Sequence, residues 1–158
     1  MVSGPVSLDD VYENNLGMLA KLVNTNYPNV YQEEFFSELF AKKSTFFTKL
    51  AYFNSVPVGT IKCKLHTKKK SDTVLKGLQI EVLTVLKNYL RVDQIREKLL
   101  NWAEEECTKH HQHNIYVHVL SENNAEIEWY TTNGFEQEVD AFTRESQIQC
   151  TLLKKHLP

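Results

Sequence analysis

The segment from Gln79 to Trp102 constrains the fold most strongly, because it reads as a strand, a turn and a helix without glycine in the turn. Residues 79–86 are rich in β-branched side chains and predict a buried strand. Apolar residues then recur every three to four positions from Val92 to Cys107, which predicts an amphipathic helix. A strand leading into a helix N-terminus often binds phosphate through free backbone N–H groups, and glycine lets the backbone approach closely. The chain therefore has the architecture of a phosphate site without its glycines.

Composition limits the class of protein. The chain has 158 residues, of which 42% are hydrophobic and 11% aromatic, as expected for one folded domain with a single core. A net charge of -2 gives no electrostatic argument for general nucleic-acid binding. The three cysteines are widely spaced, which favours a reducing compartment over a disulfide framework. We find no signal-peptide pattern and no apolar run of membrane-spanning length, so we expect a cytoplasmic protein without a membrane partner.

The remaining segments predict a mixed α/β domain around one sheet. Asn14 or Asn15 is a candidate cap for a first helix that ends before Asn26, and Asn123 is one for a last helix that ends at Asn133 and Gly134. A second helix is expected over 32–40, and residues 54–57 read as a hairpin turn. Further strands are expected over 6–11, 46–53, 58–65, 114–120, 135–139 and 147–153.

The last predicted helix closes with Trp129-Tyr-Thr-Thr-Asn-Gly-Phe135, which resembles the GNAT family of acetyl-CoA-dependent N-acetyltransferases. Segments 50–59 and 114–119 are similar to San-type N-terminal acetyltransferases, the catalytic subunits of NatE. Segments 12–19 and 152–156 resemble the budding-yeast members. The resemblance spans about Leu8 to His156 and implies an α/β GNAT fold, with a mixed, mainly antiparallel central sheet flanked by helices in a single domain over 1–158.

The same resemblance implies partners and a location. Members of this type dock on the ribosome-associated NatA complex. We therefore expect four partners: the large auxiliary subunit of that complex, its catalytic subunit, the ribosome and nascent peptide N-termini. The implied location is cytoplasmic and ribosome-associated.

The resemblance places the acetyl-CoA pyrophosphate at a turn patterned Arg/Gln-x-x-Gly-x-Gly/Ala. Here the turn reads Arg91-Val-Asp-Gln-Ile-Arg96, so Gln94 and Arg96 replace both small positions. Asp93 adds a negative charge near a dianionic ligand, although Arg96 is itself able to pair with phosphate. Alternatively, Asp93 is simply an N-cap and Arg96 a solvated residue. We expect acetyl-CoA binding to be impaired or lost. The cofactor contacts implied by the resemblance are Leu83, Thr84, Val85, Arg91, Gln94, Ile95, Arg96 and Asn123.

Acetyl transfer to a peptide α-amine requires removal of one proton and stabilisation of the thioester oxyanion. In the family, a strand tyrosine and a histidine on the next strand hold the water that accepts the proton. His118 matches the histidine, whereas Gln79 replaces the tyrosine and cannot titrate. Tyr130 matches the residue that protonates the leaving thiolate. The alternatives are a half-buried strand histidine for His118 and an aromatic packed on a helix for Tyr130.

Segment 27–31 matches the loop that contacts methionine-starting peptides in the family. Tyr27, Pro28 and Tyr31 fit that loop, and Asn29 replaces an aliphatic residue, which makes the pocket more polar. The opposite wall is reduced to Phe142. The alternative is an aromatic loop that closes the core.

Two further segments attract attention. Cys107, His110, His111 and His113 lie close in sequence, but their spacing fits no closed tetrahedral pattern, so we expect no metal site. The run Lys68-Lys69-Lys70 reads as a solvated loop tip, with a contact to ribosomal RNA backbone phosphates as the second possibility.

Three functions therefore remain open. We favour a catalytically weak or inactive GNAT subunit that acts as an accessory or adaptor, because Gln79, Gln94 and Arg96 depart together at independent steps of one chemistry. By resemblance its docking surface lies on the first two helices and the adjoining loop, where Phe35, Phe36 and Phe40 supply aromatic surface. The alternative place for these three side chains is the core. The second possibility is an active enzyme with an unusual phosphate turn. The third is a module that binds nascent chains or ribosomal RNA.

Overall fold

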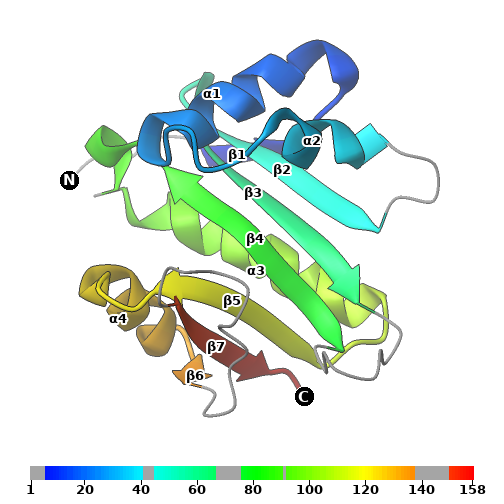
Figure 1. Cartoon of the computed structure of the whole chain (residues 1–158), viewed down its shortest axis with the longest axis vertical. Helices are drawn as coiled ribbons and strands as arrows, with labels where there is room; N and C mark the ends of the chain where they lie inside the picture. The colour runs from blue at the N-terminus through cyan, green and yellow to red at the C-terminus, as the bar shows by residue number, and fades with distance from the viewer. Residues whose placement is uncertain (1–5, 41–44, 67–75, 91, 138–149) are drawn as a thin grey trace. The chain divides into compact units, whose positions relative to one another are not determined.

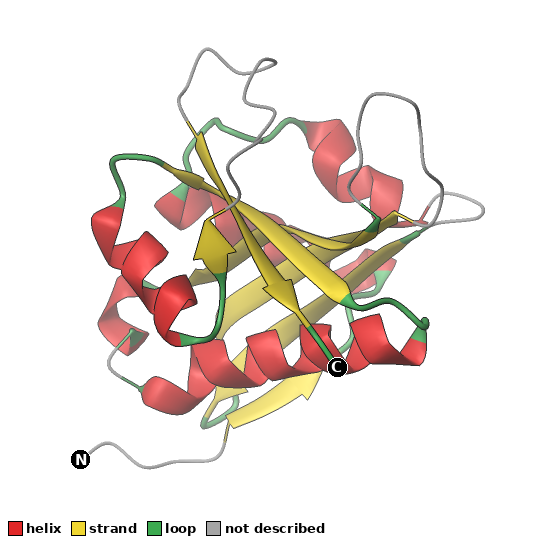
Figure 2. Ribbon diagram, turned by 90° about the horizontal axis from the view of Figure 1, so that it is seen from below, coloured by secondary structure: helices red, strands yellow, loops and turns green. Residues whose placement is uncertain are grey.

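The computed structural model describes residues 6–40, 45–66, 76–90, 92–137 and 150–158. They form two compact units, one from residues 1–64 and 82–103 and the other from 65–81 and 104–158. Strand β4 (Gly77–Val85) and helix α3 (Asp93–Lys109), both labelled in Figure 1, each have residues in both units. Figure 2 colours the helices red and the strands yellow. The strand order is β1-β2-β3-β4-β5-β7-β6.

The first unit contains a meander of β1 (Val6–Asp9), β2 (Phe46–Phe53) and β3 (Val56–His66), whose neighbours pair antiparallel. The β2–β3 turn has only two residues, Asn54 and Ser55, both with positive φ, of 50° and 68°. Such a turn matches the twist of the strands it joins. The predicted four-residue turn was therefore too long: Val56 and Pro57 already pair with β2, beside a bulge at Ala51 and Tyr52.

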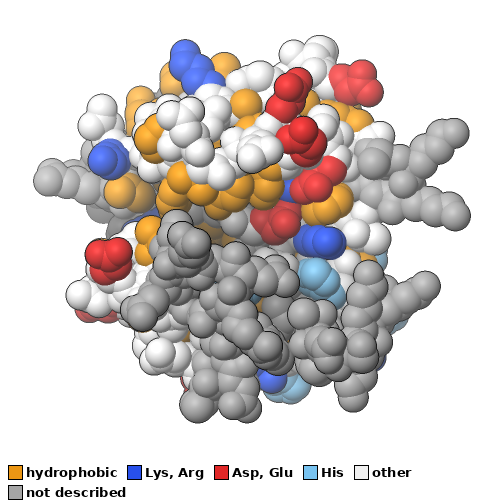
Figure 3. Space-filling view, in the orientation of Figure 1, with side chains coloured by type: hydrophobic (Ala, Val, Ile, Leu, Met, Phe, Trp, Pro, Cys, Tyr) orange, Lys and Arg blue, Asp and Glu red, His pale blue; other side chains and the backbone are white. Residues whose placement is uncertain are grey.

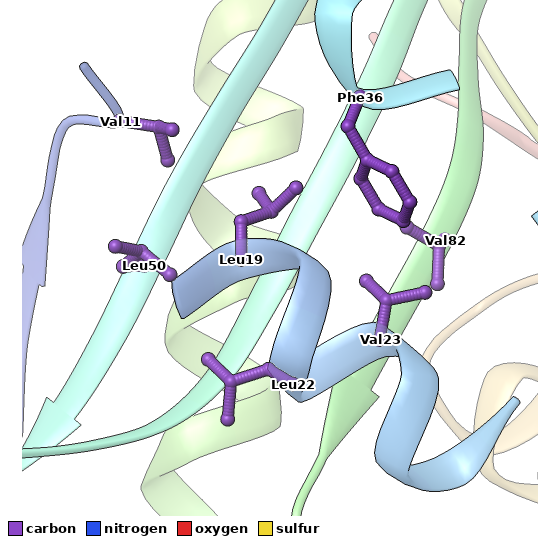
Figure 4. Close-up of a cluster of buried hydrophobic side chains, with 7 residues drawn as sticks. All are labelled: Val11, Leu19, Leu22, Val23, Phe36, Leu50 and Val82. Carbon is purple, nitrogen blue, oxygen red and sulfur yellow. The ribbon is translucent and has the colours of Figure 1, made fainter. Parts of the chain in front are cut away.

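Helices α1 (Leu16–Asn26) and α2 (Glu33–Ser37) belong to this unit, and a short 3-10 turn, Glu38–Phe40, completes the predicted second helix. Apolar side chains from both helices meet the sheet in one core cluster, drawn in Figure 4. Full burial of such a side chain contributes about 1.5–3 kcal/mol. The cluster consists of Val11, Leu19, Leu22, Val23, Phe36, Leu50 and Val82.

The cap predicted at Asn15 has a different geometry. Asn15 does precede α1, but its side chain makes no cap bond to the helix. Its Oδ1 accepts from the Tyr12 N–H at 2.6 Å, and its Nδ2 donates to the Asp10 carbonyl at 3.2 Å. The side chain therefore fixes the chain that enters α1.

The second unit is built around β5 (Asn114–Leu120). The first half of β4 pairs with it in parallel, from Leu78–Ile80 to Ile115–Val117, and β7 (Cys150–His156) pairs with it antiparallel along its whole length. β6 (Glu136–Gln137) pairs antiparallel with β7, and helix α4 (Asn124–Thr132) lies between β5 and β6 in the chain. The sheet is therefore mixed and mainly antiparallel, as predicted.

Pairing moves several predicted boundaries. β4 begins at Gly77 rather than Gln79 and ends at Val85, and β7 continues to His156, beyond the predicted Leu153. These added residues look polar or flexible in the sequence, but their backbones belong to a strand. Among the described residues, no helix is both long and apolar enough to cross a bilayer.

Candidate cofactor and catalytic site

The turn after β4 is closed by its own hydrogen bonds. A short 3-10 turn, Lys87–Tyr89, follows the strand, and α3 begins at Asp93. The amide groups of Tyr89, Leu90, Val92 and Ile95 each donate to a carbonyl three residues earlier, over 2.8–3.3 Å. Backbone amide groups of this kind are the donors that hold a phosphate at a helix N-terminus. Four of them are already committed within the turn.

The side chains that replace the small family positions lie at this turn. Gln94 is exposed and Arg96 is half-buried on the first turn of α3, while Ile95 is fully buried. A Cβ placed on Gly59 of β3 would lie 3.5 Å from Ile95 Cγ2, so Ile95 packs tightly into the core of the first unit. Arg91 lies outside the described residues. Asp93 is the first helical residue rather than the N-cap that the alternative reading expected.

The end of β4 is contacted by a residue that sequence reasoning did not single out. Asn26, the last residue of α1, donates through Nδ2 to Thr84 Oγ1 at 2.6 Å and to the Val85 carbonyl at 2.9 Å. Thr84 and Val85, both assigned to cofactor binding, are therefore hydrogen-bonded to the last residue of α1. Leu83, the third such residue on β4, is buried. The only sequence signal for this contact was a polar residue at the end of an apolar helical stripe.

The predicted peptide segment packs on the core of the first unit. Tyr27 and Tyr31 are half-buried against the core cluster, and the Tyr31 and Phe35 ring centroids lie 4.1 Å apart. Pro28 and Asn29 are exposed, and Asn29 has a φ of 63°, a conformation that asparagine tolerates better than most residues. This arrangement agrees with the reading of an aromatic loop that closes the core. Phe142 lies outside the described residues.

Gln79 and His118 belong to the second unit. Gln79 pairs with Tyr116 of β5 and is half-buried, and its Oε1 lies 2.8 Å from Nε2 of His66. Because an amide oxygen only accepts, His66 donates in this assignment. His118 is half-buried on β5, and burial lowers the pKa of its imidazole. A lowered pKa keeps the ring neutral and able to accept a proton near pH 7.

Tyr130 and Asn123 have structural partners in the second unit. Tyr130 is only 1% exposed, and its ring lies 4.9 Å from that of Trp129 and 5.1 Å from that of Phe135. Asn123 is the N-cap of α4: its Oδ1 accepts from the Glu126 N–H at 3.3 Å, while its Nδ2 donates to the Glu126 carboxylate. The predicted cap is confirmed. The side chain assigned to coenzyme A contact is thus committed to the helix.

Comparison with known proteins decides the family. Residues 16–135 match the model of the acetyltransferase (GNAT) family. The chain belongs to this family. It is 32% identical over 136 residues to N-alpha-acetyltransferase 50 of Danio rerio, covering 85% of this chain and 77% of that relative. It is 29% identical over 139 residues to the probable N-acetyltransferase san of Drosophila melanogaster, covering 86% and 71%. The predicted San-type GNAT assignment is confirmed.

Solved structures agree with the GNAT assignment. Arabidopsis thaliana Naa50, in complex with the bisubstrate analogue CoA-Ac-MVNAL, superposes with a TM-score of 0.73 and 31% identity over 95% of this chain and 97% of its own. The Thermoplasma acidophilum paia N-acetyltransferase, solved with coenzyme A, has a TM-score of 0.69 at 17% identity and shares the fold. GNAT relatives thus bind coenzyme A or its conjugates.

The cysteine and histidine segment of this GNAT chain has other roles. The Cys107 thiol donates to the Asn114 carbonyl at 3.5 Å, and burial raises its pKa to about 11, so it remains protonated. His113 and His156 contact each other through their rings. Within the described ranges, no group of three or more His, Cys, Asp or Glu side chains is placed to hold a metal ion.

The buried imidazole of His118 predicts a pH effect on stability. Its pKa is lower in the folded than in the unfolded chain, so the unfolded chain binds more protons between the two values. The stabilisation is complete above the unfolded value, about pH 6.5, and is lost as the pH falls through the folded value. His118→Gln should therefore flatten the fall in urea midpoint between about pH 7.5 and 5.5. If the urea midpoint of His118→Gln fell with pH as steeply as that of the natural chain, the lowered pKa of His118 would not be the cause of the pH effect.

Proposed function

We propose that this chain is a NatE-type GNAT subunit with little or no acetyl-CoA binding, which serves as an accessory subunit of the NatA/NatE complex. The observation that carries the proposal is the turn between β4 and α3. It has no glycine, and the amide groups of Tyr89, Leu90, Val92 and Ile95 donate within the turn. Binding a pyrophosphate there requires breaking these bonds and displacing the side chains at 94 and 96.

The second unit supports the same proposal. Gln79 stands where the family has a tyrosine, and its amide is engaged by His66. Tyr130 is enclosed by two aromatic rings rather than exposed to a substrate. A glutamine side chain does not titrate, so it cannot act as an acid or a base, and its amide oxygen is already bonded to His66. Two steps of acetyl transfer are therefore weakened independently of the phosphate turn.

The proposed docking surface is the outer face of α1 and α2. Figure 3 shows hydrophobic atoms exposed in this region and acidic side chains gathered over α2. Val30, which follows α1, is 59% exposed, and Phe40, which follows α2, is 38% exposed. Glu33 and Glu34 form the acidic first turn of α2. A surface with exposed apolar and acidic side chains suits a partner helix with apolar and basic residues. We assign this partner helix to the large auxiliary subunit of NatA, on the ribosome in the cytoplasm.

Calorimetric titration of acetyl-CoA into the purified chain tests the cofactor part of the proposal. We expect no binding heat from the natural chain, because the turn amides are engaged. Gln94→Gly/Arg96→Gly should bind with micromolar affinity, about -8 kcal/mol, since glycine allows the turn to open toward phosphate. Glu105→Gly/Lys109→Gly, on exposed positions later in α3, is the matched control and should show no heat.

Micromolar binding by the natural chain would reject the loss of cofactor binding. It would favour the second candidate function, acetylation of methionine-starting peptides, for which the neutral, half-buried His118 is the supporting observation. His118→Ala would then be expected to abolish peptide turnover. Co-purification with the NatA subunits tests the adaptor role separately. The ribosomal RNA contact through Lys68, Lys69 and Lys70 falls outside the described residues and stays a prediction.

A further inference from the structure

We propose that the side chain of Asn26 closes the end of β4 against the amide-containing arm of coenzyme A. This inference rests on the proposed loss of acetyl-CoA binding and adds a second cause, separate from the glycine-free turn. We call the two hydrogen bonds from Asn26 Nδ2, to Thr84 Oγ1 and to the Val85 carbonyl, the Asn26 bridge. All of these residues belong to the first unit.

The backbone of β4 shows which way the Val85 carbonyl points. The next amide group, that of Leu86, donates to the Val58 carbonyl of β3 at 2.8 Å. In a trans peptide the C=O group and the following N–H group point in opposite directions. The Val85 carbonyl therefore points away from β3. Strand β4 pairs with β5 only over Leu78–Ile80, so Val85 lies beyond these pairs. A carbonyl on such an unpaired strand edge is able to accept a hydrogen bond from a ligand.

The Asn26 bridge occupies this acceptor in a defined orientation. A carbonyl oxygen cannot donate, so the NH₂ group of Asn26, and not its oxygen, must face Val85. The same NH₂ group reaches the hydroxyl of Thr84, which is 5% exposed. Asn26 Oδ1 is buried and has no hydrogen-bond partner in the part of the chain that the structure describes. The oxygen of the same amide group is therefore out of contact with solvent, while the NH₂ group is held by Thr84 and Val85.

Coenzyme A chemistry explains why this acceptor matters. Its pyrophosphate is joined to an arm that carries two secondary amides, and each amide N–H needs an acceptor when it leaves water. The turn that follows β4 begins only two residues after Val85. Phosphates at that turn would lead the arm along the last residues of β4. Opening the turn alone leaves Thr84 and Val85 engaged by Asn26.

The test compares acetyl-CoA affinities in the opened background Gln94→Gly/Arg96→Gly, measured by calorimetry on the full chain. Adding Asn26→Ala should tighten binding about tenfold, as expected when a competing hydrogen bond and its side chain are removed. Asn24→Ala, an exposed position on the same helix, is the matched control and should leave the affinity unchanged. Pantetheine carries the two amides but lacks the phosphates. It should bind the single variant Asn26→Ala more tightly than the natural chain, without the substitutions at 94 and 96.

A second variant guards against unfolding. Asn26→Leu keeps a similar side-chain volume, adds no charge and cannot donate to Val85 or Thr84, so it should also tighten binding. Equal affinity with and without the Asn26 substitutions would overturn this inference and leave the proposed function intact. Micromolar binding of acetyl-CoA by the natural chain would overturn both.

Discussion

Replacing Gly77 by alanine is expected to destabilise the second unit severely. Gly77 has a φ of 146°, and a Cβ there would lie 2.2 Å from the backbone oxygen of Asn114, far inside van der Waals contact. The strain and the displaced β5 backbone together should cost about 3–5 kcal/mol, a large share of the stability of a small domain. The Asn114 carbonyl also accepts from the Cys107 thiol, and this contact would be lost. Urea unfolding followed by circular dichroism measures the loss.

Gly17→Ala is the matched control for this prediction. Gly17 lies on α1, and among the described residues no atom beyond its chain neighbours and its own helix backbone is found within 4 Å of the position its Cβ would take. Alanine there should stabilise the protein by about 0.5–1 kcal/mol, because glycine is costly inside a helix. Equal urea midpoints for the two variants would contradict the view that close approach at Gly77 decides the effect.

Glu38→Gln is expected to have the second large effect. Its partner Lys62, on β3, has no exposed side-chain area, and its Nζ forms an ion pair with Glu38. The same Nζ lies 3.7 Å from the centroid of the Phe35 ring and 4.3 Å from that of Phe46. Removing the carboxylate leaves a buried ammonium with less compensation, which should cost about 3 kcal/mol. The measurement is the urea midpoint at pH 7.

Two companion variants separate charge from packing. Lys62→Met/Glu38→Gln removes both charges while keeping most of the volume between the rings, so it should recover most of the loss. Asp10→Asn breaks the Lys49–Asp10 pair, whose side chains are 21% and 56% exposed, and should cost about 0–1 kcal/mol. If Glu38→Gln proved as mild as Asp10→Asn, burial of Lys62 would not be what makes its ion pair important.

The Lys62 contacts also connect the sheet to the predicted peptide segment. Lys62 lies over Phe35, and Phe35 packs on Tyr31 at the end of that segment. Nothing in the local sequence distinguishes Lys62 from Lys64, two residues later, yet Lys62 is fully buried and Lys64 is partly exposed. The difference arises because α2 and its 3-10 turn cover one position of β3, and a single sequence does not reveal which strand position a distant helix covers.

The sequence by itself determined the kinds and order of the elements, the GNAT family and the absence of glycine from the phosphate turn. These features depend on local periodicity, capping and motif spacing, as at Asn123, whose cap bond is as predicted. Only the tertiary structure decided the roles of Asn26, Lys62 and Gly77. Each role depends on a partner far along the chain, such as Thr84, which is 58 positions from Asn26. Hydrogen bonding, burial and close approach between such positions follow from how the elements pack, which local patterns do not encode.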